Sequence, residues 1–105
     1  MTKLIILVAS AALVFSSSAL ARKTCPEALV QNIQIESDHV LYKQVGYPWR
    51  RLGILDEPGT RERLSALLAA QMANKKVIVA YKNNEYSCIS ENYSESAYLL
   101  RTHND

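Results

Sequence analysis

Between residues 60 and 81, apolar residues first recur at helical spacing and then form a short continuous run. This pattern predicts a helix followed by a strand. Apolar side chains recur at helical spacing at Leu64, Leu67, Leu68 and Met72. Thr60 is a suitable N-cap, and Asn74 tolerates the left-handed conformation that often ends a helix. Residues 77–81 are mostly β-branched and apolar, which is typical of a central strand. We expect the helix to cover a sheet formed by the rest of the mature chain.

Shorter segments elsewhere alternate apolar and polar residues, as half-buried strands do. Ile33 and Ile35, for example, alternate with polar neighbours. The predicted strands span residues 32–36, 39–45, 49–55, 77–81, 86–90 and 96–102, and residues 27–31 are expected to form a short helical turn. Three strands, one helix and three strands predict a mainly β fold, a small antiparallel barrel capped by the helix and either closed or partly open.

The first 21 residues have the features of a signal peptide. Lys3 is followed by an apolar run from Leu4 to Phe15, and Ala19-Leu20-Ala21 fits an A-x-A cleavage site. The run is short for a membrane span, although an uncleaved anchor is the alternative. We therefore expect a single domain over residues 22–105, secreted or periplasmic, without an integral membrane span after cleavage.

The two cysteines, Cys25 and Cys88, both lie in the mature region. Small exported domains commonly use a disulfide to supplement a limited core. Only one intramolecular pairing is possible, and it would stabilise the fold by about 4 kcal/mol in the chain-entropy model. Two free thiols are the alternative. A metal site is not expected, because His39 and His103 lack ligand spacing to either cysteine.

Charge and residue spacing limit the function classes. The net charge of +2 is too small to indicate a nucleic-acid partner or an anionic membrane surface. His39 and His103 are isolated in sequence, and Gly46, Gly53 and Gly59 do not form a phosphate-binding loop. We therefore expect no catalytic residues, no enzyme activity and no cofactor.

The best binding candidates are aromatic and arginine side chains near residue 50, together with one loop tyrosine: Tyr47, Trp49, Arg50, Arg51 and Tyr93. Aromatic rings stack on sugars, and arginine supplies several donors in a fixed geometry. The same residue types are enriched at subunit interfaces. A third interpretation is structural, with Trp49 filling the barrel and both arginines solvated. The core would need a large side chain such as Trp49, because the mature chain contains no phenylalanine.

Several segments resemble the B subunits of Shiga-type toxins. Ser65–Gln71, Val77–Val79 and Ser96–Arg101 are similar to that family's helix, fourth strand and last strand, with Asn83 and Cys88 in corresponding places. The resemblance implies an OB-like barrel that forms a ring of five subunits, binds a host glycan or glycolipid and delivers a toxic A subunit. It also implies that the helices line a central pore.

The sequence departs from the family where the family contacts sugar. Shiga-type subunits carry a run of aspartates in the first hairpin turn, whereas residues 37–39 here contain only Asp38, and Trp49 lies too far upstream to match the family's tryptophan before the helix. We therefore transfer none of the family's sugar-contacting residues. The residues expected to pack the helix in an oligomer are Ala66, Ala69, Ala70 and Ala73.

The expected function is that of a ring-forming, pentameric, glycan-binding B subunit of an AB5-type toxin or a relative of one. The alternative is a monomeric secreted or periplasmic protein-interaction module or inhibitor that binds its partner through residues 47–51.

Overall fold

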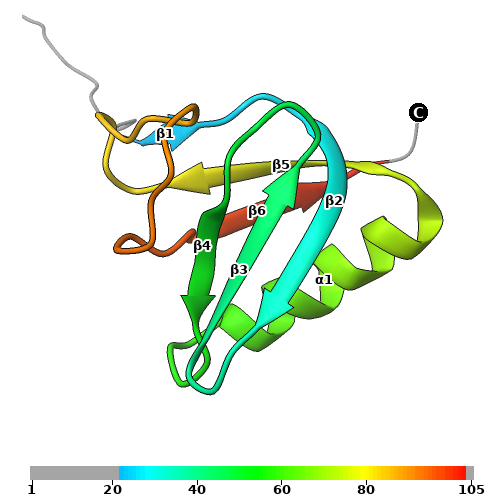
Figure 1. Ribbon diagram of the computed structural model, residues 1–105, viewed down its shortest axis with the longest axis horizontal. Helices are drawn as coiled ribbons and strands as arrows, with labels where there is room; N and C mark the ends of the chain where they lie inside the picture. The colour runs from blue at the N-terminus through cyan, green and yellow to red at the C-terminus, as the bar shows by residue number, and fades with distance from the viewer. Residues whose placement is uncertain (1–21, 104–105) are drawn as a thin grey trace, which may run out of the picture.

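The computed structural model describes residues 22–103, which form six strands and one helix (Figure 1). The predicted signal segment lies outside these residues. The elements are β1 (Lys23–Thr24), β2 (Ala28–Ile35), β3 (His39–Gln44), β4 (Arg50–Ile54), α1 (Thr60–Ala73), β5 (Lys76–Tyr81) and β6 (Leu99–Thr102). Within the described residues, no helix is both long and apolar enough to cross a membrane.

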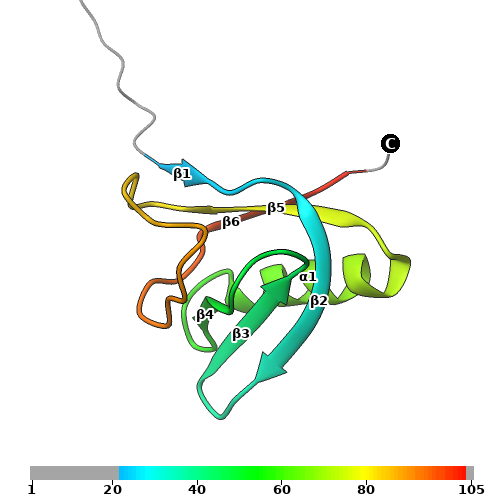
Figure 2. The same cartoon turned by 45° about the horizontal axis from the view of Figure 1, so that its top comes forward.

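The strands form one curved antiparallel sheet. Its order is β1-β5-β2-β3-β4, and β6 also pairs with β5. Figure 2 shows β2 curving between two parts of the sheet, since its first residues pair with β5 and the remainder pairs with β3. The structure therefore confirms a mainly β antiparallel fold with one helix.

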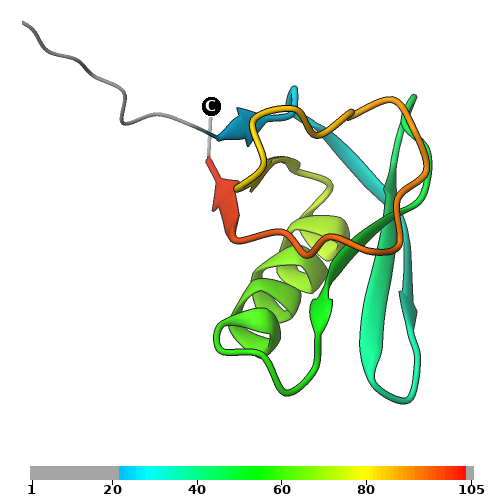
Figure 3. The ribbon, with the colours of Figure 1, turned by 90° about the vertical axis from the view of Figure 1, so that its left-hand side faces the viewer.

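The barrel is open because β4 and β6 do not pair. The connection between β5 and β6, residues 82–98, runs from the region of β1 across to β4 before it reaches β6 (Figure 3). Its main chain contacts β4 directly: the amide of Arg51 donates to the Asn92 carbonyl at 3.0 Å, and the amide of Ala97 donates to the Leu52 carbonyl at 3.1 Å. An irregular segment thus occupies the place of a closing strand pair.

The core lies between the concave face of the sheet and one side of α1. Its fully buried aliphatic side chains come from three strands and the helix: Val40, Leu52, Leu67, Val77 and Val79. The predicted disulfide is confirmed. It joins Cys25 to Cys88, with 5.7 Å between their Cα atoms, and attaches the 82–98 connection to the chain just after β1.

Three sequence-based assignments near the ends of the domain are wrong. Residues 28–31 belong to β2 rather than to a helical turn, because Ala28 and Leu29 pair with β5. Residues 86–90 form an irregular loop with a turn at Cys88 and Ile89 rather than a strand; Tyr86 stacks on Tyr81, and Cys88 is bonded to Cys25. The last strand begins at Leu99 rather than at residue 96.

The helix has the predicted length but is rotated relative to the predicted apolar face. Leu67 is fully buried, whereas Leu68 is 37% exposed and Met72 is 87% exposed. The N-cap is Gly59, with φ of 89°, and not Thr60, whose side chain is buried. Asn74 ends the helix as predicted, in the left-handed conformation, with its N–H directed at the Ala70 and Gln71 carbonyls.

Candidate binding pocket

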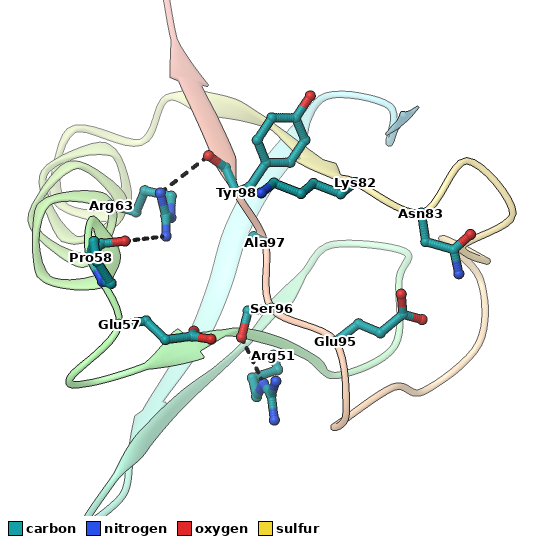
Figure 4. A pocket seen from close by; sticks show the side chains of 10 residues that line it. All are labelled: Arg51, Glu57, Pro58, Arg63, Lys82, Asn83, Glu95, Ser96, Ala97 and Tyr98. Atoms are coloured by element: carbon teal, nitrogen blue, oxygen red, sulfur yellow. Dashed lines mark hydrogen bonds between the residues drawn. The ribbon is translucent and has the colours of Figure 1, made fainter. Parts of the chain in front are cut away.

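A surface pocket of about 510 Å³ lies where the start of α1 meets β4 and the ends of the 82–98 connection (Figure 4). Its lining comprises Arg51, Glu57, Pro58, Arg63, Lys82, Asn83, Glu95, Ser96, Ala97 and Tyr98. Segments far apart in the sequence therefore meet at one polar hollow. We refer to these ten residues as the polar pocket.

Arg51 holds one wall of the polar pocket in place. Its Nε donates to Ser96 Oγ at 3.1 Å, and its terminal nitrogens donate to the main-chain carbonyls of Tyr93 at 3.1 Å and Ser94 at 2.9 Å. A guanidinium presents its donors in a rigid fork, so three simultaneous bonds fix the loop relative to β4. Arg51, predicted as a ligand contact, thus lines the pocket and also positions its wall.

Glu57 supplies an ionised acceptor beside Ser96 (Figure 4). The amide of Ile54 donates to Glu57 Oε1 at 3.0 Å. This backbone hydrogen bond lowers the pKa of the Glu57 carboxyl, and the Ser96 hydroxyl lowers it further. The Asp56–Gly59 turn that carries Glu57 also begins the helix, so the helix start determines the position of the carboxylate.

Tyr98 provides the aromatic surface of the pocket. Arg63 Nη1 donates to the Tyr98 carbonyl at 3.2 Å, and Arg22 donates to the Tyr98 hydroxyl at 3.2 Å. The Lys82 ammonium lies 5.9 Å from the centre of the Tyr98 ring, within the range of a cation–π interaction. Hydrogen bonds therefore hold Tyr98 at its main-chain carbonyl and at its hydroxyl, and the Lys82 ammonium lies beside its ring.

The polar pocket combines groups that suit a ligand rich in hydroxyls. Lys82 and Asn83 can donate hydrogen bonds, Glu57 and Glu95 can accept them, and Tyr98 offers an apolar ring. Neither described histidine lines it: His39 bonds to Asp38 at 2.6 Å, and His103 pairs with Glu27 at 2.9 Å. Within residues 22–103, no group of three or more His, Cys, Asp or Glu side chains could hold a metal ion.

The structure separates the side chains of the predicted 47–51 binding segment. Tyr47 and Trp49 are half-buried, Arg50 is fully buried and Tyr93 is exposed. The expectation that both arginines are solvated is therefore wrong for Arg50, and it is Arg50 rather than Trp49 that is completely enclosed. Tyr47 lines a separate hollow of about 380 Å³ beside Cys88 and Ile89.

The helix alanines lie along a second shallow groove. A hollow of about 450 Å³ is lined by Ala66, Ala69, Ala70, Ala73, Lys75, Thr102 and His103. Ala70 is only 4% exposed and belongs largely to the core, whereas Ala69 and Ala73 are exposed. The outer face of α1 thus presents small side chains beside the exposed Leu68 and Met72.

Most of the polar pocket was not predicted from the sequence. Glu57 and Lys82 lie between the predicted elements, and Tyr98 was expected only as part of the strand over residues 96–102. The usable signal was the Asp56-Glu57-Pro58-Gly59 turn, since a carboxylate at a helix start is positioned by the backbone there. Nothing local indicated that residues 95–98 would lie against it.

The structure defines a small, mainly β domain with one helix and one disulfide. A scan of protein-family models and searches of curated proteins and of solved structures found no match. The resemblance to Shiga-type B subunits therefore stays a prediction from the sequence.

Proposed function

We propose that the mature chain is an exported glycan-binding subunit that assembles into a ring, as a toxin B subunit or a relative of one. The observation that carries this proposal is the polar pocket, in which ionised acceptors, donors and the Tyr98 ring lie around one hollow. Sugars present hydroxyls at their edges and C–H groups on their faces, so they match this combination. The protein then acts by binding rather than by catalysis.

Assembly through the helix is supported by its outer face. Leu68 and Met72 are exposed beside Ala69 and Ala73, and small residues permit close packing of a neighbouring helix. Exposed apolar patches bordered by polar residues are typical of protein contacts. We propose that this face is buried in a homo-oligomeric ring, with a toxic A subunit as its further partner.

A labelled sample of the mature, oxidised protein on a broad glycan array tests the binding function. We expect a defined set of glycans to be retained, and Lys82→Ala to weaken their binding at least tenfold. Lys76→Ala is the matched control, because Lys76 is an exposed lysine of β5 outside the polar pocket. An array without any bound glycan, or equal losses in the two variants, would contradict the proposal.

Light scattering after size exclusion, over a dilution series, tests the assembly. We expect the mass of a pentamer that persists on dilution. A monomer at every concentration would contradict the proposed ring. It would not bear on glycan binding, which the array tests separately.

A second candidate is a monomeric interaction module or inhibitor, favoured by the hollow that Tyr47 and Ile89 line. Ile89, an apolar residue of this lining, is 78% exposed. A pull-down that recovers one stoichiometric protein, and that fails with Ile89→Ser, would support this candidate. Unchanged recovery with that variant would exclude the surface.

A further inference from the structure

The interior of the barrel contains a fully buried arginine. Arg50, on β4, is 0% exposed. Its Cζ atom lies 5.2 Å from the ring centre of Tyr42 and 5.5 Å from that of Tyr47. Arginine stays protonated in proteins, so Arg50 cannot lose its charge on burial as a lysine or histidine can.

No carboxylate neutralises Arg50 within residues 22–103. The ion pairs found there all involve His39 or His103. Arg50 Nη2 donates to Gln44 Oε1, and the Gln44 amide is oriented by its own donation to the Ala28 and Val77 carbonyls, at 3.1 Å each. Gln44 therefore supplies one neutral acceptor and no counter-charge.

Two nitrogens of the guanidinium lack acceptors among the described residues. Arg50 Nε and Nη1 are both buried without a hydrogen-bond partner. Tyrosine rings stabilise the charge through their faces, but they do not accept these N–H groups as an oxygen or an anion would. A buried charge without full compensation strongly destabilises a fold.

A third buried donor belongs to Tyr86. Its ring stacks on Tyr81 with 3.7 Å between centres, yet its hydroxyl has no partner among the described residues. The hydroxyls of the other two core tyrosines are satisfied: Tyr42 and Tyr81 bond to each other at 2.9 Å, and Tyr81 donates to the Arg51 carbonyl at 3.0 Å. Burial raises the pKa of Tyr86, while the nearby Tyr81 hydroxyl and the Arg50 charge oppose that rise.

We propose that the barrel interior binds a small monovalent inorganic anion, chloride in an exported protein, through Arg50 and Tyr86. A water molecule could accept these hydrogen bonds but would leave the net charge of Arg50 uncompensated. A halide supplies both a hydrogen-bond acceptor and a negative charge. The ligand must be small, because Arg50 has no exposed surface. This site is separate from the polar pocket and independent of the glycan-binding proposal.

Thermal unfolding of the mature, oxidised protein at constant ionic strength tests the site. Sodium chloride or sodium bromide replaces sodium gluconate, whose anion is too large for an enclosed site. We expect the unfolding midpoint to rise with halide and to saturate. In crystals grown with bromide, we expect an anomalous peak within hydrogen-bond distance of Arg50.

Two variants separate halide binding from general salt effects. Arg50→Met should abolish the saturable response. Because that variant could fail to fold, Tyr86→Phe provides a second test: it keeps the stacked ring and should weaken the apparent halide affinity about tenfold, as expected for losing one hydrogen bond to a charged group. A wild-type midpoint independent of halide, or the same halide affinity in Tyr86→Phe, would overturn the proposal.

Discussion

At the scale of single residues, Gly53 allows β4 and the start of α1 to approach closely. A Cβ atom at this position would lie 2.9 Å from Thr60 Cγ2 and in closer contact still with Thr60 Oγ1. Thr60 is fully buried and β-branched, so it cannot move away easily. The glycine is therefore required by this contact rather than by its backbone angles.

Gly53→Ala should lower the free energy of unfolding by about 1–3 kcal/mol, the usual range for overpacking a core. Urea denaturation measures the change. In a Thr60→Ala background the same substitution should be less destabilising, because the clashing atoms are gone. An equal loss in both backgrounds would show that another contact is responsible.

Glu57 should contribute to stability in a pH-dependent way. Its pKa in the folded state lies below the ordinary value of 4.5, chiefly because of the Ile54 backbone hydrogen bond. Its stabilisation is therefore present above that value and is lost as the pH falls through the folded-state pKa. Denaturation curves between neutral and acid pH should show a smaller acid loss for Glu57→Gln than for wild type.

The exposed neighbour Asp56 provides the control for losing one charge. Asp56→Asn should follow the wild-type pH profile. If both variants flattened the profile equally, the net charge rather than the Glu57 hydrogen bond would explain the effect.

At the scale of elements, α1 has two faces with different tasks. Leu67 and Ala70 pack against the sheet, whereas Leu68 and Met72 point away from it. The inner face contributes Leu67 and Ala70 to the core of the domain. The outer face, which includes the alanine groove, is available for a second copy of the chain.

Met72→Glu should dissociate the proposed ring without destabilising the subunit. Met72 is 87% exposed, so the charge would remain solvated in a monomer but would be buried in a helix–helix contact. Light scattering should show the subunit mass, with an unchanged helical circular dichroism signal. Ile89→Glu, an equally drastic change at a loop position that is 78% exposed, should leave the assembly intact.

At the scale of the whole molecule, the 82–98 connection joins the parts of the open barrel. The disulfide attaches it near β1, Tyr86 stacks on β5, and Arg51 binds it to β4. The same connection lines the polar pocket through its two ends. The proposed binding site and the stability of the domain are therefore linked through one irregular segment.

Replacing both Cys25 and Cys88 with alanine should lower the free energy of unfolding by about 4 kcal/mol, the chain-entropy value for a closed loop of this length. The two cysteines are 63 residues apart in the sequence. Hydrogen exchange should increase first in residues 82–98. Without the disulfide, this connection would be held mainly by the Arg51 hydrogen bonds and the Tyr86 stack. An unchanged denaturation midpoint would contradict this account.

The sequence by itself determined the features that depend on local pattern. Residues 39–44 and 50–54 form strands where β-type residues were recognised, and the helix ends at Asn74 because that residue tolerates the left-handed conformation. The disulfide followed from having only two cysteines in a small domain that the sequence predicts to be exported. The strands and the helix end depend on the preferences of a few neighbouring residues, and the disulfide depends only on the number of cysteines.

Only the tertiary structure decided which surfaces face one another. The apolar period of α1 allowed Leu68 and Met72 to be core residues, but the sheet covers the side that carries Leu67 and Ala70. Arg50 looked like a surface donor and lies inside the barrel, since β4 turns it toward Tyr42 and Gln44. The polar pocket likewise exists because long-range packing brings residues 95–98 against the start of the helix, and such contacts leave no periodic signal along the chain.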